Sequence, residues 1–150
     1  MTGVPGSVLF CCTHNSIRSP MAEALLKYFH GKRIFVDSVG VRASEIDGFV
    51  VAVMAELGVD ISTHKPMTFK ELDDWEGLSF DLIISLSPEA QHSAVEMTRT
   101  MACDVEFWPT MDPSVVEGSR EERLEAYRDV RDTLMARIRD RFPITGAPEI

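Results

Sequence analysis

The stretch that most constrains the fold is SVLFCCTHNSIRSPMAEALLKYF, residues 7–29. Its apolar start runs without a break into two adjacent cysteines, which is typical of a strand buried in a parallel sheet. Ser19-Pro20 then indicates a helix start, because serine is a common N-cap and proline lacks an N–H that the first turn would leave unused. The stretch therefore predicts a strand at 8–12, a helix with Ser19 as its N-cap, and a short loop that carries Cys12 and Arg18.

The same alternation continues along the rest of the chain. The patterns predict further strands at 33–39, 80–86 and 104–107, further helices at 46–57, 87–100 and 119–142, and a helical turn or two at 68–74. Strands that alternate with helices form βαβ units and hence a parallel sheet. We expect one doubly wound α/β domain over residues 1–150, with a four-stranded parallel sheet flanked by helices and a flexible tail at 143–150.

Charge and cysteine content narrow the function classes. The chain has 24 acidic and 15 basic residues, a formal net charge of −9, which disfavours nucleic-acid binding because that relies on a basic face. No apolar run approaches the length of a membrane span, and residues 1–6 lack a signal-peptide pattern. Three cysteines, two of them adjacent, are a poor disulfide framework. We expect a cytoplasmic protein that binds neither nucleic acid nor membrane.

The loop between the first strand and helix has the composition of an anion site. Backbone N–H groups that turn inward at a helix start form a cradle for a tetrahedral oxyanion. Arg18 adds a planar guanidinium that can hold two oxygens, and the positive surroundings favour the thiolate of Cys12 as a nucleophile. The hydroxyl of Ser19 can donate to that thiolate. The predicted phosphate-binding residues are Thr13, His14, Asn15, Ser16, Ile17, Arg18 and Ser19.

A second catalytic candidate lies in WPTMDPSVVEG, which follows the predicted strand at 104–107. Asp112-Pro113 therefore falls at the same edge of the sheet as Cys12. A carboxylic acid there can protonate a leaving oxygen and then activate the water that hydrolyses a cysteinyl-phosphate. The alternative is a plain turn, because Asp-Pro often starts one. No Cys/His spacing suggests a metal, so we expect neither metal nor cofactor.

VLFCCTHNSIRSPMAEALL and the downstream Asp-Pro resemble the signature of the low-molecular-weight protein tyrosine phosphatase family, in a spacing that runs through nearly the whole chain. The resemblance implies that Cys12 is the nucleophile, Arg18 the phosphate clamp, Ser19 the thiolate donor and Asp112 the general acid. It also implies that Asn15 locks the loop, through His64 in STHKP. The expected substrates are phosphorylated proteins, with phosphotyrosine first, or small phosphate esters. We expect a monomer or a weak homodimer.

Several positions depart from that family's pattern. Ile17 stands where many members carry a second cysteine that protects the nucleophile by forming a disulfide. Ser114-Val115 replaces the aromatic residues that tyrosine-specific members carry after Asp-Pro. Trp108 is either one wall of the substrate site or a core residue. His14 either faces the phosphate or lies on a solvated rim, and we favour the rim.

Two other functions stay open. Arsenate reductases share this scaffold, and DSVGVRASEIDGFVVAVMAELGVDIS looks somewhat closer to that branch. Thioredoxin-linked members need two more cysteines after the third strand, where this chain has SLSPEAQHSAVEM, and Cys103 is expected at the opposite end of the sheet. Only reduction with an external small thiol remains. The second alternative is a non-catalytic phosphate- or phosphopeptide-binding module.

Overall fold

A four-stranded sheet organises the chain. The computed structural model describes residues 5–31, 33–76, 79–99 and 101–143, so the predicted tail at 143–150 lies outside the described residues except for Pro143. The strands are β1 (Ser7–Cys12), β2 (Phe35–Gly40), β3 (Leu82–Ser85) and β4 (Asp104–Phe107). Every pairing is parallel, in the order β2-β1-β3-β4. The order reverses between β1 and β3, which is where doubly wound sheets bind ligands.

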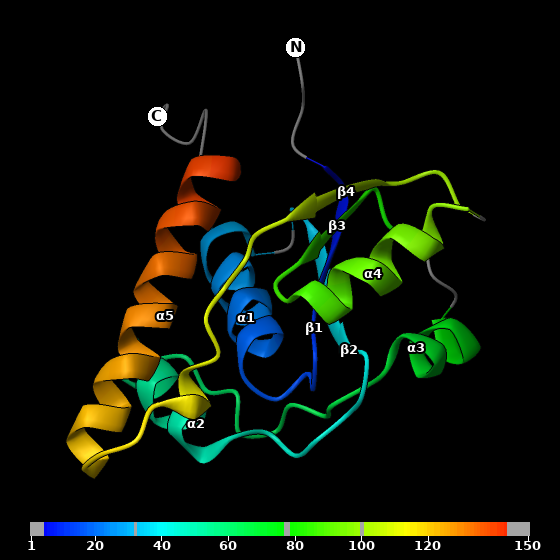
Figure 1. The fold of residues 1–150 in the computed structure, drawn as a ribbon. Coiled ribbons are helices and arrows are strands. Elements are labelled where there is room, and N and C mark those ends of the chain that lie inside the picture. The colour runs from blue at the N-terminus through cyan, green and yellow to red at the C-terminus, as the bar shows by residue number, and fades with distance from the viewer. Residues whose placement is uncertain (1–4, 32, 77–78, 100, 144–150) are drawn as a thin grey trace, which may run out of the picture.

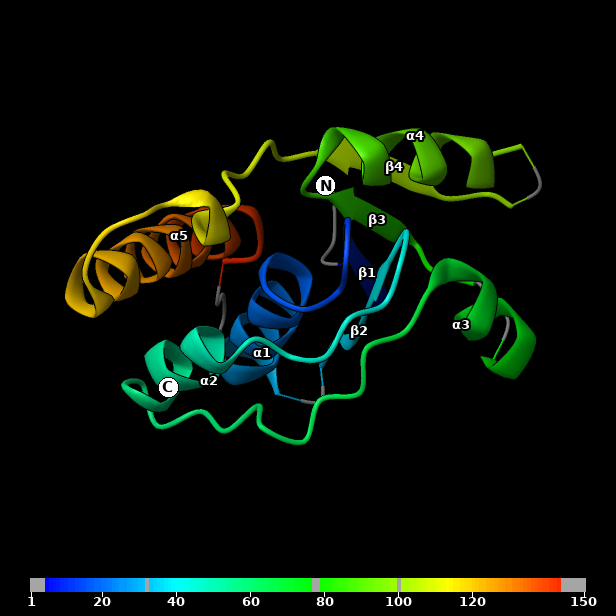
Figure 2. The ribbon, with the colours of Figure 1, turned by 60° about the horizontal axis from the view of Figure 1, so that its bottom comes forward.

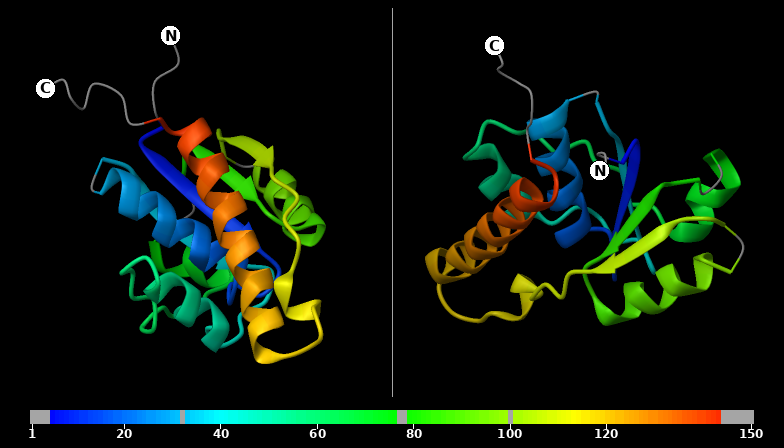
Figure 3. Two further views of the ribbon diagram at one scale, coloured as in Figure 1. Left: turned by 90° about the vertical axis from the view of Figure 1, so that its left-hand side faces the viewer. Right: turned by 90° about the horizontal axis from the view of Figure 1, so that it is seen from above.

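Helices cover both faces of the sheet, as Figures 1 and 2 show. The helices α1 (Arg18–His30), α2 (Gly48–Ala55) and α5 (Arg120–Arg141) lie on one side. The other side carries α3 (Phe69–Glu76) and α4 (Pro88–Met97). A short 3-10 helix, η1 (Pro113–Val115), lies beside the first turns of α5 (Figure 3). The predicted four-stranded parallel α/β fold is confirmed.

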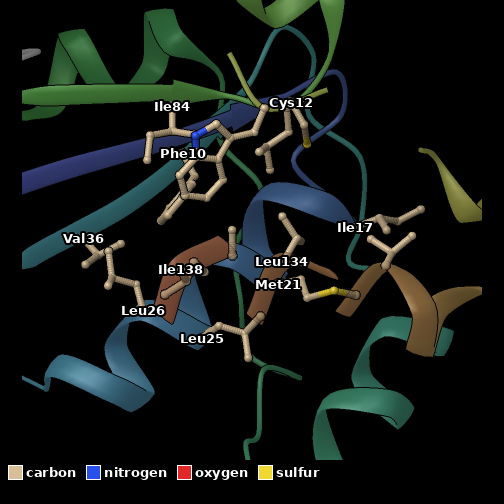
Figure 4. Close-up of a cluster of buried hydrophobic side chains, with 14 of the residues drawn as sticks. Phe10, Cys12, Ile17, Met21, Leu25, Leu26, Val36, Ile84, Leu134 and Ile138 are labelled. Carbon is tan, nitrogen blue, oxygen red and sulfur yellow. The ribbon is translucent and has the colours of Figure 1, made fainter. Parts of the chain in front are cut away.

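Successive residues of β1 feed two separate cores. Val8, Phe10 and Cys12 join the cluster beneath α1, α2 and α5, part of which is drawn in Figure 4. Leu9 and Cys11 join the cluster on the opposite face. Side chains of a strand alternate between its faces, so each face of β1 is fully apolar and the run has no polar break. The two adjacent cysteines consequently point to different layers of the molecule.

The predicted elements are all present, with differences at their ends. The strands predicted at 33–39 and 80–86 are formed over Phe35–Gly40 and Leu82–Ser85, since only these residues pair with β1. The helix predicted at 119–142 is α5, and a reciprocal capping box between Ser119 and Glu122 fixes its start. None of the helices in the described part of the chain is long and apolar enough to cross a bilayer.

Candidate active site

The segment between β1 and α1 lies at the carboxyl edge of the sheet, next to the point where the strand order reverses. We call residues 13–19 the anion loop. The helix begins at Arg18 with Ile17 as its N-cap, and no side chain caps it. The expectation that Ser19 is the N-cap is therefore wrong, because its hydroxyl is turned to Cys12 and is not available to the helix end. In the first turn the Ser19 N–H donates to the Cys12 sulfur at 3.4 Å, and Pro20 has no N–H.

Hydrogen bonds to the carbonyl groups of Cys12 and of the anion loop fix the orientation of this loop. The carbonyl groups of Cys12, Thr13, His14 and Ser16 accept from backbone N–H groups in the segment 41–47 at 2.8–3.1 Å. Among the described residues, by contrast, no backbone N–H from Thr13 to Arg18 donates a hydrogen bond to another part of the chain. Backbone donors normally find partners, so a run of open N–H groups at a helix start is the arrangement of an anion cradle.

Cys12 lies at the floor of this cradle. Its sulfur is 3.0 Å from Ser19 Oγ and accepts from the Ser19 backbone N–H at 3.4 Å. The residue is only 2% exposed and belongs to the apolar cluster beneath α1, and these two contacts join its sulfur to Ser19 at the start of that helix. The Ser19 N–H donates to the sulfur, and the Ser19 hydroxyl is within hydrogen-bond distance of it.

Asn15 ties the anion loop to the sheet. It has a left-handed φ of 54° and is fully buried. Its Nδ2 donates to Ser19 Oγ at 2.9 Å and to Ser38 Oγ at 3.0 Å. Its Oδ1 accepts from the Met67 N–H at 2.8 Å and lies 3.1 Å from His64 Nε2. All four contacts are 2.8–3.1 Å long, two of them buried and two part-buried, and together they fix the position of the loop.

His64 thus occupies the supporting position that the family resemblance implies. Because Asn15 Oδ1 can only accept, Nε2 of His64 carries the proton in this contact. Burial holds the pKa of His64 below its ordinary value, and the carboxylate of Glu23, 3.9 Å from Nδ1, opposes this in part. A neutral ring with Nε2–H satisfies both observations.

The sequence analysis missed two members of this network. Ser38 donates to Glu23 Oε1 at 2.5 Å, and Glu23 in turn pairs with Lys27. Glu23 lies four residues after Ser19, one helical turn along α1, which is the only signal that the sequence offers. Ser38 belongs to a different strand, and its role depends on the register of β2 against β1.

Arg18 connects the anion loop to the segment after β4. Its side chain is buried, and Nη1 donates to the Thr110 carbonyl at 2.9 Å. This bond brings the Asp-Pro segment to the edge of the sheet where Cys12 lies. Asp112 is half-buried there, and its Oδ1 accepts from Ser114 N–H at 2.9 Å and Ser114 Oγ at 2.7 Å. These bonds orient the carboxyl group through Oδ1, and no hydrogen bond to Oδ2 is found among the described residues.

The rim of the site is polar on one side and apolar on the other. His14 is exposed, with Nδ1 3.4 Å from Ser44 Oγ, so the rim position is the correct one. Trp108 is a core residue that packs edge-on against Phe10 at 6.1 Å between ring centroids, and it does not form a wall. Met111 and Val115, 54% and 68% exposed, flank Asp112.

No second thiol of the described chain lies near Cys12. Cys11 faces the opposite core, where its thiol contacts the Ile84 carbonyl at 3.7 Å. Cys103 precedes β4 and therefore lies at the amino edge of the sheet, opposite the site. Burial raises the pKa of both thiols. The described residues also include no cluster of three or more potential metal ligands.

Comparison with known proteins adds relatives of two kinds. The model of the family described as low molecular weight phosphotyrosine protein phosphatase matches residues 7–142. An arsenate reductase of Bacillus licheniformis is 35% identical over 93% of this chain and 96% of its own length. A glutaredoxin arsenate reductase of Synechocystis is 30% identical over 87% of this chain and 92% of its own. The crystal structure of the low molecular weight protein tyrosine phosphatase from T. tengcongensis superposes with a TM-score of 0.71 at 28% identity, over 90% of this chain and 95% of that one.

Proposed function

Because the chain belongs to the low molecular weight phosphotyrosine protein phosphatase family, we propose that Cys12 attacks a tetrahedral oxyanion held in the anion loop. The observation that carries this proposal is the anion loop itself: a cysteine sulfur in contact with Ser19, a run of backbone N–H groups without a partner among the described residues, and the buried guanidinium of Arg18. Arsenate, reduced with an external small thiol, is the first candidate substrate.

Two observations favour arsenate over phosphotyrosine. The relatives that match 87–93% of this chain are named arsenate reductases, so they support our alternative better than our first expectation. Two candidate positions for an aromatic wall also fail to provide one in the described part of the chain, because Trp108 is in the core and Ser114-Val115 follow the Asp-Pro. Arsenate needs only the cradle and Arg18.

In the first step the Cys12 thiolate forms a bond to arsenic, and one arsenate hydroxyl leaves as water after Asp112 gives it a proton. The external thiolate then attacks the sulfur of Cys12. The sulfur–arsenic bond breaks, its electron pair stays on arsenic, and As(V) leaves as As(III) in arsenite. Cys12 and the thiol remain as a mixed disulfide, which a second thiol molecule reduces. Two thiols thus supply the two electrons.

The reductant must come from outside because Cys11 and Cys103 lie on other sides of the sheet. A low-molecular-weight thiol, or a protein that transfers one, fits this requirement. One relative carries such a protein, glutaredoxin, in its name.

Hydrolysis of phosphate monoesters is the second candidate, and Asp112 is the residue that favours it. An oriented carboxylic acid can protonate an alkoxide or phenoxide leaving group and then activate water against the cysteinyl-phosphate. The low molecular weight protein tyrosine phosphatase from T. tengcongensis, whose structure superposes on the chain with a TM-score of 0.71, supports this second candidate.

Two assays on the same preparation test these candidates. Arsenite formation is followed with arsenate and mercaptoethanol, and phosphate release is followed with aryl phosphates. We expect thiol-dependent arsenite formation that Cys12→Ser abolishes. Phosphate release without arsenite would select the second candidate. Phosphate binding by the cradle with neither reaction would select the non-catalytic binding module.

A further inference from the structure

Two guanidinium groups near the start of α5 stack on one aromatic ring. The Cζ atoms of Arg120 and Arg123 lie 5.3 Å and 4.6 Å from the centroid of Phe49, which belongs to the first turn of α2. A guanidinium that stacks on a ring keeps its N–H donors free, because they point sideways in its own plane. The ring therefore holds two cations in place without neutralising them.

The neighbouring carboxylates are engaged with other groups. Glu121 pairs with Arg128 at 2.8 Å, and Glu122 accepts from the Ser119 N–H at 2.8 Å. Within the part of the chain that the structure describes, neither Arg120 nor Arg123 forms an ion pair with a carboxylate within 4.0 Å. The chain as a whole has a net charge of −9. Two adjacent guanidinium groups that form no ion pair within the described residues are therefore a local positive site.

This site lies beside the anion loop. The Asp47 N–H donates to the Ser16 carbonyl at 3.1 Å, and the Tyr127 hydroxyl donates to Asp47 Oδ2 at 3.1 Å. Tyr127 follows Arg123 by about one turn of α5. Burial raises the pKa of Tyr127, the carboxylates of Asp47 and Asp112 add to this and Arg123 opposes it, so Arg123 and Asp112 both lie within electrostatic reach of Tyr127. Figure 3 shows η1 beside the same turns of α5.

We propose that Arg120 and Arg123, held over Phe49, bind a carboxylate of the molecule that approaches Cys12. A carboxylate matches the planar donors of a guanidinium in a bidentate way. This inference rests on the proposed function and specifies the chemical class of the reductant, which is a small thiol that carries a carboxylate. The carboxylate of this thiol binds to the two arginines while its sulfur reaches Cys12. A carboxylate in a phosphorylated peptide is the other source, and the second candidate reaction would use it.

The test compares two thiols that differ in charge. At saturating arsenate, kcat/KM is measured for mercaptopropionate and for mercaptoethanol, with the wild type and with the double variant R120Q/R123Q. Exposed ion pairs contribute up to about a factor of five each, so we expect the ratio between the two thiols to fall by roughly 2- to 30-fold. Mercaptoethanol should react at an unchanged rate. Equal loss with both thiols, or an unchanged ratio, would overturn the proposal.

Arg139→Gln is the matched control. Arg139 lies on the same helix and stacks on Phe29 at 4.9 Å in the same manner, but it is about 24 Å further along α5 than Arg123. It should leave both thiols unaffected. A fall in the ratio with Arg139→Gln would show that net charge, and not this site, is responsible.

Two further experiments test the carboxylate site separately from the proposed arsenate reduction. If the wild type reduces no arsenate with any thiol, phosphotyrosyl peptides with flanking glutamates are compared with their glutamine counterparts, and the double variant should remove a preference for glutamate. Independently of any activity, propionate should shift the Nε–H resonances of Arg120 and Arg123 in an NMR titration and leave that of Arg139 in place. Absence of both effects would refute the carboxylate site, whichever reaction the enzyme catalyses.

Discussion

Ser19 has three neighbours that make its hydroxyl more than a helix-start residue. Its Oγ lies 3.0 Å from the Cys12 sulfur, accepts from Asn15 Nδ2 and lies 3.3 Å from the Val39 carbonyl. The hydroxyl can donate its proton to the sulfur or to the Val39 carbonyl, and when Cys12 is a thiolate its negative charge makes the sulfur the stronger acceptor. A hydrogen bond to a charged group contributes about 1.5–3 kcal/mol.

Ser19→Ala should therefore make Cys12 a less reactive thiol. We expect its alkylation by iodoacetamide at mildly acidic pH to slow by about tenfold, which is the lower end of that range because the Ser19 N–H remains. The rate is followed by intact-protein mass spectrometry. Ser114→Ala, which removes a hydroxyl from the Asp-Pro segment, is the control and should not change it. An unchanged rate in Ser19→Ala would show that the hydroxyl does not stabilise the thiolate.

Asp112→Asn tests the general acid. Asparagine can keep the contacts to Ser114 but cannot give up a proton, so the loop is preserved while the chemistry is lost. General acid catalysis contributes about 10²–10⁴-fold, and the loss should be largest for aryl phosphates with poor leaving groups and small for good ones. A series of aryl phosphates measures this dependence. Equal loss across the series would mean that Asp112 acts only on the structure of the loop.

At the scale of elements, the sequence predicted every strand and α-helix because each carries its own periodicity or end signal, whereas the short 3-10 helix η1 was expected to be part of a loop. The start of α1 is the exception. Ser19-Pro20 has the form of an N-cap, but the helix begins at Arg18 because the serine hydroxyl is used by Cys12. The segments 41–47 and 108–112 have no periodicity, and long-range hydrogen bonds to the anion loop and to Arg18 set their paths. Such contacts join residues that are far apart in the sequence, so local patterns do not predict them. The contact of Ser38 with Asn15 and that of the Thr110 carbonyl with Arg18 could therefore not be predicted.

The end of β2 shows how closely these segments pack. A Cβ added to Gly40 would lie 2.3 Å from the Arg42 carbonyl oxygen and 2.7 Å from the Asn15 backbone nitrogen. Both contacts are with backbone, so neither can be relieved by a side-chain rotation. Gly40 is opposite Cys12 in the β1–β2 register, and any shift here reaches the nucleophile.

Gly40→Ala should consequently damage stability and activity together. Overpacking of this kind costs about 1–3 kcal/mol, which a urea titration of the folded protein measures. The fall in kcat/KM should exceed what the loss of folded protein explains, because the anion loop is displaced. Gly48→Ala is the matched control, since a Cβ at that position meets nothing within 4 Å. Full activity in Gly40→Ala would show that the loop adapts without cost.

At the scale of the whole molecule, the sheet separates the three cysteines. Cys12 opens into the anion loop, Cys11 is enclosed in the core beneath α3 and α4, and Cys103 stands at the far edge. Adjacent strand residues point to opposite faces, so Cys11 and Cys12 are poorly placed for a disulfide although they are neighbours in sequence. Ile17, at the loop position where a protecting cysteine is common in the family, packs in the apolar cluster.

The response to peroxide follows from this separation. Oxidation of the Cys12 thiolate gives a sulfenic acid, which needs a second thiol to form a reversible disulfide. No thiol of the described chain lies in reach, so peroxide alone should drive Cys12 to sulfinic and sulfonic acids, and dithiothreitol should not restore activity. With mercaptopropionate present during the exposure, a mixed disulfide should form instead and activity should return on reduction. Intact-protein mass spectrometry distinguishes the two products. The C11S/C103S double variant should behave as the wild type does; recovery in the wild type without added thiol, lost in this variant, would show that an internal thiol does reach Cys12.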